Sequence, residues 1–196
     1  NILRKYISPE HLKKLRLKFG YSNSKGYFVG YKVTMVLKKN TRTPVSILIH
    51  PGAPNDSKIF DEVLKELKRR SLIKPKDLIY FDRGYFSYEN YKIGINKYKI
   101  IPVIFPKEIF KINKLQDQMS YSLMIYKNKK EIKENKKLTK HLQKWSLIKL
   151  ENWKDYKPTR GIIEDFFKAA KGAFGLGKFP ASQTNPCTKT SIYAYY

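Results

Sequence analysis

The chain has 196 residues, enough for one domain with a core of its own. Its 41 Lys and Arg residues against 16 Asp and Glu residues give a net charge of +25, which favours a polyanionic partner, most simply nucleic acid, over a small-molecule substrate. An apolar content of 41% excludes a disordered basic tail, and the single cysteine, Cys187, excludes a disulfide framework and a Cys-rich zinc site. No membrane span or signal-peptide core is recognisable, so we expect a cytoplasmic protein.

The first quarter of the chain predicts a short helix followed by a hairpin. Capping residues open a helix expected over residues 8–18, and Gly20 is expected to end it. Residues 27–38 and 45–50 are rich in β-branched and aromatic side chains, and a turn-forming segment separates them. These two segments are therefore predicted to pair as strands.

The middle of the chain alternates between helix and strand patterns. Residues 55–57 carry capping side chains, and apolar residues follow them at helical spacing. This pattern predicts a helix after the cap. Residues 78–81 form a short apolar run, typical of a strand covered on both faces. A helix near 87–96 and a strand at 99–105 follow, and Pro102 places that strand near a sheet edge.

The composition changes after Pro106. Residues 107–158 carry 14 lysines against six acidic residues, and we interpret them as an inserted, DNA-facing segment whose structure the sequence leaves open. Helical periodicity returns over residues 159–174. The predicted class is α/β, a mixed sheet flanked by helices, and the expected divisions are a core of residues 1–106, the basic insertion 107–158, a helix completing the core in 159–180, and a tail of 181–196.

Two acidic residues lie at positions where a catalytic or metal-binding site could form. Asp82 follows the apolar strand at the sheet end, although a turn residue capping the next helix is the simpler alternative. Glu164 lies in an apolar helix, where a solvent-facing pair with Arg160 is the simpler alternative. Together, carboxylates from two chain segments could hold a hard cation such as Mg²⁺ beside a polyanion.

Four stretches carry a resemblance to a known family: GYFVGYKVTMVL, PVSILIHPGAPNDSKIFDEVL, DLIYFDRGYFSYENY and RGIIEDFFKAAKGAFGL. They resemble DDE-type insertion-sequence transposases, whose catalytic core is RNase H-like. The resemblance implies three carboxylates that bind two Mg²⁺ ions. It matches Asp82 to the second Asp and Glu164 to the Glu, both as catalytic and metal-binding residues.

The family's catalytic helix has a signature of Tyr, two residues, Arg, three residues, Glu, six residues and Lys. Arg160, Glu164 and Lys171 keep this spacing, whereas Tyr156 comes one residue too early. The resemblance implies that Arg160 and Lys171 contact DNA phosphates near the metal ions. For both residues, plain solvated charge is the alternative.

The first Asp of the family pattern has no match. Residues 1–55 contain one acidic residue, Glu10, and Asp56 and Asp61 come too late, so we interpret these two as a helix cap and a helix-surface residue. We expect that the first strand of the RNase H-like sheet is missing and that one lost carboxylate leaves metal binding weak.

The sequence therefore predicts a fragment of a DNA transposase that binds DNA but cleaves it poorly. The parent reaction is metal-dependent DNA cleavage and strand transfer, with transposon ends and target DNA as partners. A non-catalytic basic nucleic-acid-binding protein is the alternative, and whether this chain is itself an enzyme stays open. We expect association with the nucleoid when DNA is bound, and a homodimer is left open.

Several aromatic and basic residues are weaker candidates. The aromatic group between residues 85 and 91 could stack on DNA bases, but helix packing is favoured. Trp145 and Trp153 are expected to anchor the insertion to the core, and His50 to be a strand-end residue. The lysines near 127–140 are predicted to contact phosphates or simply to be solvated.

Overall fold

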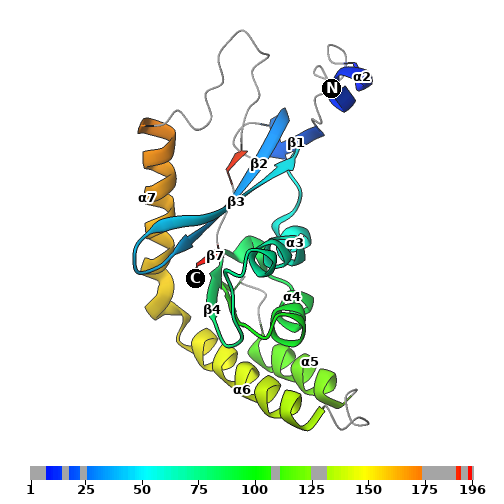
Figure 1. The fold of residues 1–196 in the computed structure, drawn as a ribbon, viewed down its shortest axis with the longest axis vertical. Coiled ribbons are helices and arrows are strands. Elements are labelled where there is room, and N and C mark those ends of the chain that lie inside the picture. Colours follow the sequence, from blue (N-terminus) through cyan, green and yellow to red (C-terminus); the bar gives the residue numbers. More distant parts are fainter. Residues whose placement is uncertain are drawn as a thin grey trace.

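The computed structural model describes residues 8–14, 18–22, 26–106, 111–124, 132–173, 189–190 and 194–195. These residues form a mixed α/β structure in which helices flank a seven-stranded sheet (Figure 1). The predicted α/β class is confirmed. The path through the sheet runs β1-β2-β7-β4-β5, with β3 and β6 also pairing with β2.

The predicted hairpin is confirmed as β2 (Gly26–Lys38) and β3 (Thr43–Pro51), which pair antiparallel. The expected helix before it is shorter, since α2 covers Pro9–Lys14 and β1 (Lys18–Ser22) follows. Gly20 thus lies in a strand. Pairing with β2 overrides the local turn pattern here, because it sets Tyr21 opposite Tyr27 with ring centroids 5.1 Å apart.

The alternating middle of the chain also forms as predicted. Helix α3 (Asp56–Arg69) buries its apolar stripe, and strand β4 (Leu78–Phe81) follows. A short η1 turn (Arg83–Tyr85), α4 (Tyr88–Lys92) and a π-helical turn η2 (Ile93–Lys97) lead to β5 (Ile101–Ile104). Strand β5 pairs with β4 and ends the sheet path, in line with the edge position that Pro102 predicts.

The middle of the sheet is closed by residues near the end of the chain. Strand β7 (Ala194–Tyr195) lies between β2 and β4, parallel to β2 and antiparallel to β4. Strand β6 (Lys189–Thr190) pairs with β2 alongside it. The described part of the segment interpreted as a tail therefore belongs to the sheet.

The two faces of the sheet carry separate apolar cores. Val36, Ile79 and Phe81 pack with α3, α4 and the helices that follow β5. Met35, Leu37, Tyr80 and Val103 pack instead with α7 (Lys157–Ala173), through Ile163 and Phe167. Because successive strand residues point to opposite faces, these clusters define three layers: α3 and α4, the sheet, and α7.

The basic insertion is helical where the structure describes it. Helices α5 (Ile112–Met124) and α6 (Ile132–Glu151) run side by side at one end of the molecule (Figure 1), linked by a 3.1 Å hydrogen bond from Gln143 Nε2 to the Met119 carbonyl. A turn, η3 (Trp153–Tyr156), joins α6 to α7. Trp145 is 39% exposed, so its prediction as a core anchor is wrong, whereas Trp153 is half-buried.

Candidate functional site

Strand β4 brings Asp82 to the sheet end, as the sequence predicts. Asp82 keeps an extended backbone, with φ −64° and ψ 157°, and precedes the η1 turn without capping it through its side chain. Ile79 and Phe81 face the α3 layer and Tyr80 faces α7. Strand alternation therefore assigns Asp82, which is half-buried, to the face that α7 covers.

The turn after Asp82 packs tightly against the start of α3. A Cβ atom added to Gly84 would lie 2.6 Å from Asp56 Oδ2, and its three closest neighbours would all be Asp56 atoms. The absence of a side chain at this position is what lets the carboxylate approach the turn. Gly84 is thus required by close contact rather than by an unusual φ angle.

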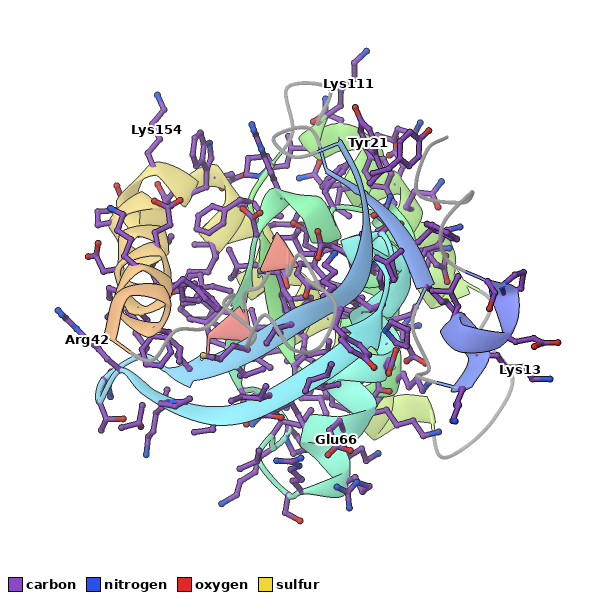
Figure 2. The ribbon with its side chains drawn as sticks, turned by 90° about the horizontal axis from the view of Figure 1, so that it is seen from above. Lys13, Tyr21, Arg42, Glu66, Lys111 and Lys154 are labelled. Carbon is purple, nitrogen blue, oxygen red and sulfur yellow. The ribbon has the colours of Figure 1, made fainter. Side chains whose placement is uncertain are left out.

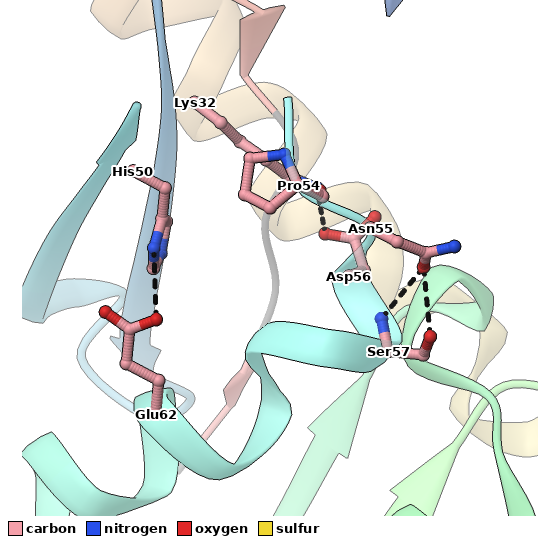
Figure 3. Close-up of polar contacts among 7 residues, drawn as sticks. All are labelled: Lys32, His50, Pro54, Asn55, Asp56, Ser57 and Glu62. Atoms are coloured by element: carbon pink, nitrogen blue, oxygen red, sulfur yellow. Dashed lines mark hydrogen bonds and ion pairs between the residues drawn. The ribbon is translucent and has the colours of Figure 1, made fainter. Parts of the chain in front are cut away.

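A buried ion pair fixes that carboxylate. Lys32 Nζ lies 2.7 Å from Asp56 Oδ1, with side-chain exposures of 4% and 18%, and it also donates a 2.6 Å hydrogen bond to the Pro54 carbonyl (Figure 3). The interpretation of Asp56 as a helix cap is wrong, because Asn55 is the N-cap and accepts from Ser57 N at 3.1 Å. Asp56 instead pairs with Lys32 of β2 and lies against Gly84 in the turn that follows Asp82.

A second polar link joins the same turn to α3. The buried Asn90 side chain donates to the Tyr85 carbonyl at 2.7 Å and to the Ser57 carbonyl at 3.0 Å. The turn after β4 therefore lies against the N-terminal end of α3, next to the Asp56 side chain and bonded through the Asn90 side chain. A site built on this turn would be rigid, which is what precise placement of a reacting group requires.

His50 lies beside this ion pair, directly across the hairpin from Lys32. It is buried, and its Nδ1 is 3.5 Å from a Glu62 carboxylate oxygen (Figure 3). Burial lowers the pKa of His50 below 6.5, and the positive charge of Lys32 lowers it further, while Glu62 and Asp56 act in the opposite direction. His50 is therefore a strand-end residue, as predicted, and it is buried there with its pKa held below the ordinary value.

Glu164 lies on α7, half-buried and directly after Ile163. Ile163 belongs to the same apolar cluster as Tyr80, two residues before Asp82, so α7 and β4 contribute to one cluster on one face of the sheet. Asp165, the next residue, is 78% exposed and 3.8 Å from Lys168. The prediction that Asp82 and Glu164 share a metal ion stays a prediction.

The remaining signature residues of the last helix have different outcomes. The backbones of Arg160 and Lys171 belong to α7, but their side chains lie outside the described part of the structure. Tyr156 has defined contacts. Its ring centroid is 5.3 Å from that of Tyr80, and its hydroxyl accepts a 2.6 Å hydrogen bond from Lys149 Nζ.

Carboxylate oxygens suit Mg²⁺, which often uses one or two protein carboxylates and completes its shell with water and phosphate oxygens. The side chains of Asp82 and Glu164 supply the kind of ligand atom that such an ion prefers. Within the described residues, however, no group of three or more His, Cys, Asp or Glu side chains could hold a metal ion. The described residues thus contain no three-carboxylate set, and an ion shared by Asp82 and Glu164 stays a prediction.

The aromatic group after Asp82 is part of the core. Tyr85 and Tyr91 are almost completely buried, Phe86 is buried, and the Tyr91 hydroxyl donates to the Ile104 carbonyl at 3.0 Å. Helix packing, the favoured alternative, is therefore confirmed over stacking on DNA bases. Cys187 lies outside the described residues.

Sequence reasoning missed Lys32 and misread Asp56. The available signal was a lysine inside a strand otherwise rich in apolar and aromatic residues, and such a lysine needs either solvent or a buried partner. Local patterning did not reveal which of the two applies, since the partner is 24 residues away in the sequence. Only the tertiary structure shows which residue pairs with a buried lysine.

Positively charged side chains project from more than one side of the described structure. Figure 2 shows Lys13, Arg42, Lys111 and Lys154 projecting outward from different sides. Among the described residues, no helix combines the length and hydrophobicity that crossing a bilayer requires. Net charge alone therefore does not single out one interaction surface.

Residues 7–186 match the family model described as Transposase DDE domain. The matched range includes the Lys32–Asp56 pair, the turn after β4 and helix α7. No curated protein and no solved structure matches the chain.

Proposed function

Because the match covers residues 7–186, the chain belongs to the family of the transposase DDE domain, and we propose that it acts on DNA with Asp82 and Glu164 as its catalytic carboxylates. The family match is the observation that carries this proposal. In support, the strand before Asp82 and the helix carrying Glu164 contribute Tyr80 and Ile163 to the same apolar cluster.

In this proposal Asp82 and Glu164 hold Mg²⁺, while Arg160 and Lys171 contact DNA phosphates. Such an ion, when bound, lowers the cost of forming the attacking oxygen and stabilises the leaving oxygen of a phosphodiester. The role of the turn after β4 is to hold the Asp82 carboxylate in one place. The Lys32–Asp56 pair and the Asn90 hydrogen bonds support that role.

The parent reaction is cleavage of DNA at an element end, after which the freed 3′ hydroxyl attacks target DNA. We propose that this chain binds DNA but cleaves it slowly. Residues 1–55 offer only Glu10 as an acid, and Asp56 is engaged by Lys32. A site that lacks one carboxylate leaves the attacking oxygen poorly positioned. In the cell we expect the protein in the cytoplasm, on the nucleoid, and the oligomeric state stays open.

The test measures DNA binding, Mn²⁺ binding and plasmid nicking on the same samples. We compare Asp82→Asn and Glu164→Gln with two control variants, Asp165→Asn and Asp117→Asn, which change exposed acids on helices. We expect weak Mn²⁺ binding, read by electron paramagnetic resonance, to be lost in the first two variants and kept in the controls. DNA binding should survive in all four, and nicking should be slow and metal-dependent.

Two results would overturn parts of this proposal. Efficient nicking that survives Asp82→Asn would refute the assignment of Asp82. DNA binding with no Mn²⁺ binding in the wild type would favour the alternative, a non-catalytic basic nucleic-acid-binding protein. Sedimentation of the wild type measures whether it is a homodimer.

A further inference from the structure

Helix α6 presents a basic and aromatic surface to solvent. Its exposed residues between Lys137 and Trp145 lie one, three or four positions apart, which places them on one side of the helix, and Glu151 is exposed on the same side two turns beyond Lys144. The opposite side, with Leu142, Ser146 and Leu150, is buried. We call the exposed side the α6 face; it consists of Lys137, Lys140, His141, Lys144 and Trp145.

An exposed tryptophan on such a surface needs an explanation. Trp145 is 39% exposed, although indole rings usually gain most from burial. The His141 ring centroid lies 6.2 Å from that of Trp145, and Lys149 Nζ lies 5.8 Å from the Trp145 ring centroid. An exposed aromatic ring among lysine side chains is the arrangement that binds a base by stacking and the neighbouring phosphates by charge.

The α6 face continues toward the candidate catalytic strand. Lys149 Nζ lies 4.9 Å from the Tyr156 ring centroid and donates to the Tyr156 hydroxyl. The Tyr156 ring in turn packs on Tyr80, two residues before Asp82. Contacts therefore connect Trp145 to β4 without a break.

We propose that the α6 face binds single-stranded DNA, with Trp145 stacking on a base and the three lysines contacting phosphates. The identity of the partner as DNA rests on the proposed function. Charge complementarity argues for this occupant, because the exposed side of α6 carries three lysines between Lys137 and Trp145 against one exposed acid, Glu151, near its C-terminal end. Stacking on an indole requires a base that is not already stacked in a duplex, which selects a single strand or an unpaired end.

The chain contains two tryptophans, so each can be made the only indole reporter. In Trp153→Phe the remaining indole is Trp145, and we expect saturable quenching of its fluorescence by an oligothymidylate. In Trp145→Phe the remaining indole is Trp153, and we expect little quenching at the same degree of binding. Circular dichroism checks that both variants are folded.

Affinity measurements separate stacking from charge. Trp145→Ala should weaken oligothymidylate binding about tenfold or more, as expected for loss of one base stack. The triple variant Lys137→Gln, Lys140→Gln, Lys144→Gln should lower the slope of log affinity against log salt by about 2. A control triple variant, Lys65→Gln, Lys68→Gln, Lys74→Gln, removes the same charge from exposed positions on and after α3 and should change the slope little.

The outcomes distinguish this inference from the proposed function. If the wild type binds DNA but Trp145 is not quenched and both triple variants behave alike, the α6 face is not the binding surface, and the proposed function stands. If duplex DNA binds through the same lysines without quenching Trp145, the stacking role is wrong. If no DNA binds to the wild type, the proposed function fails together with this inference.

Discussion

The ion pair at the start of α3 and the α6 face both depend on lysine, but the two regions use it in opposite ways. Lys32 is 4% exposed and its ammonium group contacts two oxygen atoms of the chain, on Asp56 and Pro54. The lysines of the α6 face point into solvent and are available for a partner. Removing the charge at Lys32 leaves a carboxylate without its counterion, whereas removing it on α6 exchanges one solvated group for another.

This difference teaches that a net charge of +25 does not describe one electrostatic property. Buried and exposed lysines contribute equally to the sum. They differ in what they stabilise: the first kind stabilises the fold around Asp82, and the second kind attracts a polyanion.

The largest effect on stability is expected for Lys32→Met. It should lower the free energy of unfolding by about 3 kcal/mol, because the Asp56 carboxylate stays near the core without its counterion. Adding Asp56→Asn should recover part of this loss, since the uncompensated charge is then gone. Lys58→Met, an exposed position on α3, is the control. Urea denaturation measures these three variants and Asp56→Asn alone, and strictly additive losses in the double variant would contradict the pairing.

Gly84→Ala is expected to cost somewhat less, about 1–3 kcal/mol, because the new methyl group must displace the Asp56 carboxylate. The cost should fall sharply in an Asp56→Ala background, where the obstructing atoms are absent. A double-mutant cycle by urea denaturation measures this coupling. An equal cost in both backgrounds would show that the turn after β4 does not depend on Asp56.

His50 gives the ion-pair region a pH dependence. Its pKa in the folded protein is below the ordinary value of 6.5, so below about pH 6.5 the unfolded chain takes up a proton that the folded protein resists. The stability that neutral His50 provides is therefore complete above pH 6.5 and is lost as the pH falls. The free energy of unfolding of His50→Gln should vary less between pH 7.5 and pH 5.5. His141→Gln, at an exposed position, should follow the wild type.

The smallest effect on stability is expected for the triple glutamine variant of the α6 face. Its free energy of unfolding should stay within about 0.5 kcal/mol of the wild type, because exposed lysines contribute little to folding. The same variant is expected to lose affinity for DNA. A large loss of stability would show that these lysines support α6 itself, which would remove the contrast with Lys32.

Local patterns predicted the elements nearest the candidate site. The apolar run of residues 78–81, the amphipathic helix beginning at residue 56 and the final helix all formed close to their predicted bounds. Each is specified by its own residues, through periodicity, capping and β-branched content, which act over a few neighbours. Asp82 and Glu164 could be singled out for the same reason, since their settings are local.

Strand β1 and the exposure of Trp145 were beyond local patterning. The segment of residues 18–22 is short and contains a glycine. It forms a strand only because it can pair with the edge of β2. Trp145 has the composition of a core residue, and its exposure depends on which side of α6 meets α5 and the sheet. Sequence periodicity over a basic, mixed helix does not identify that side.

By itself the sequence determined the excess of positive charge, the helix and strand elements around Asp82, and the family to which residues 7–186 belong. Only the tertiary structure decided which lysine is buried against Asp56, which tryptophan meets solvent and which short segment closes the middle of the sheet. The reason is physical. Periodicity and capping act between residues a few positions apart, whereas burial and ion pairing depend on groups that meet only after the chain has folded.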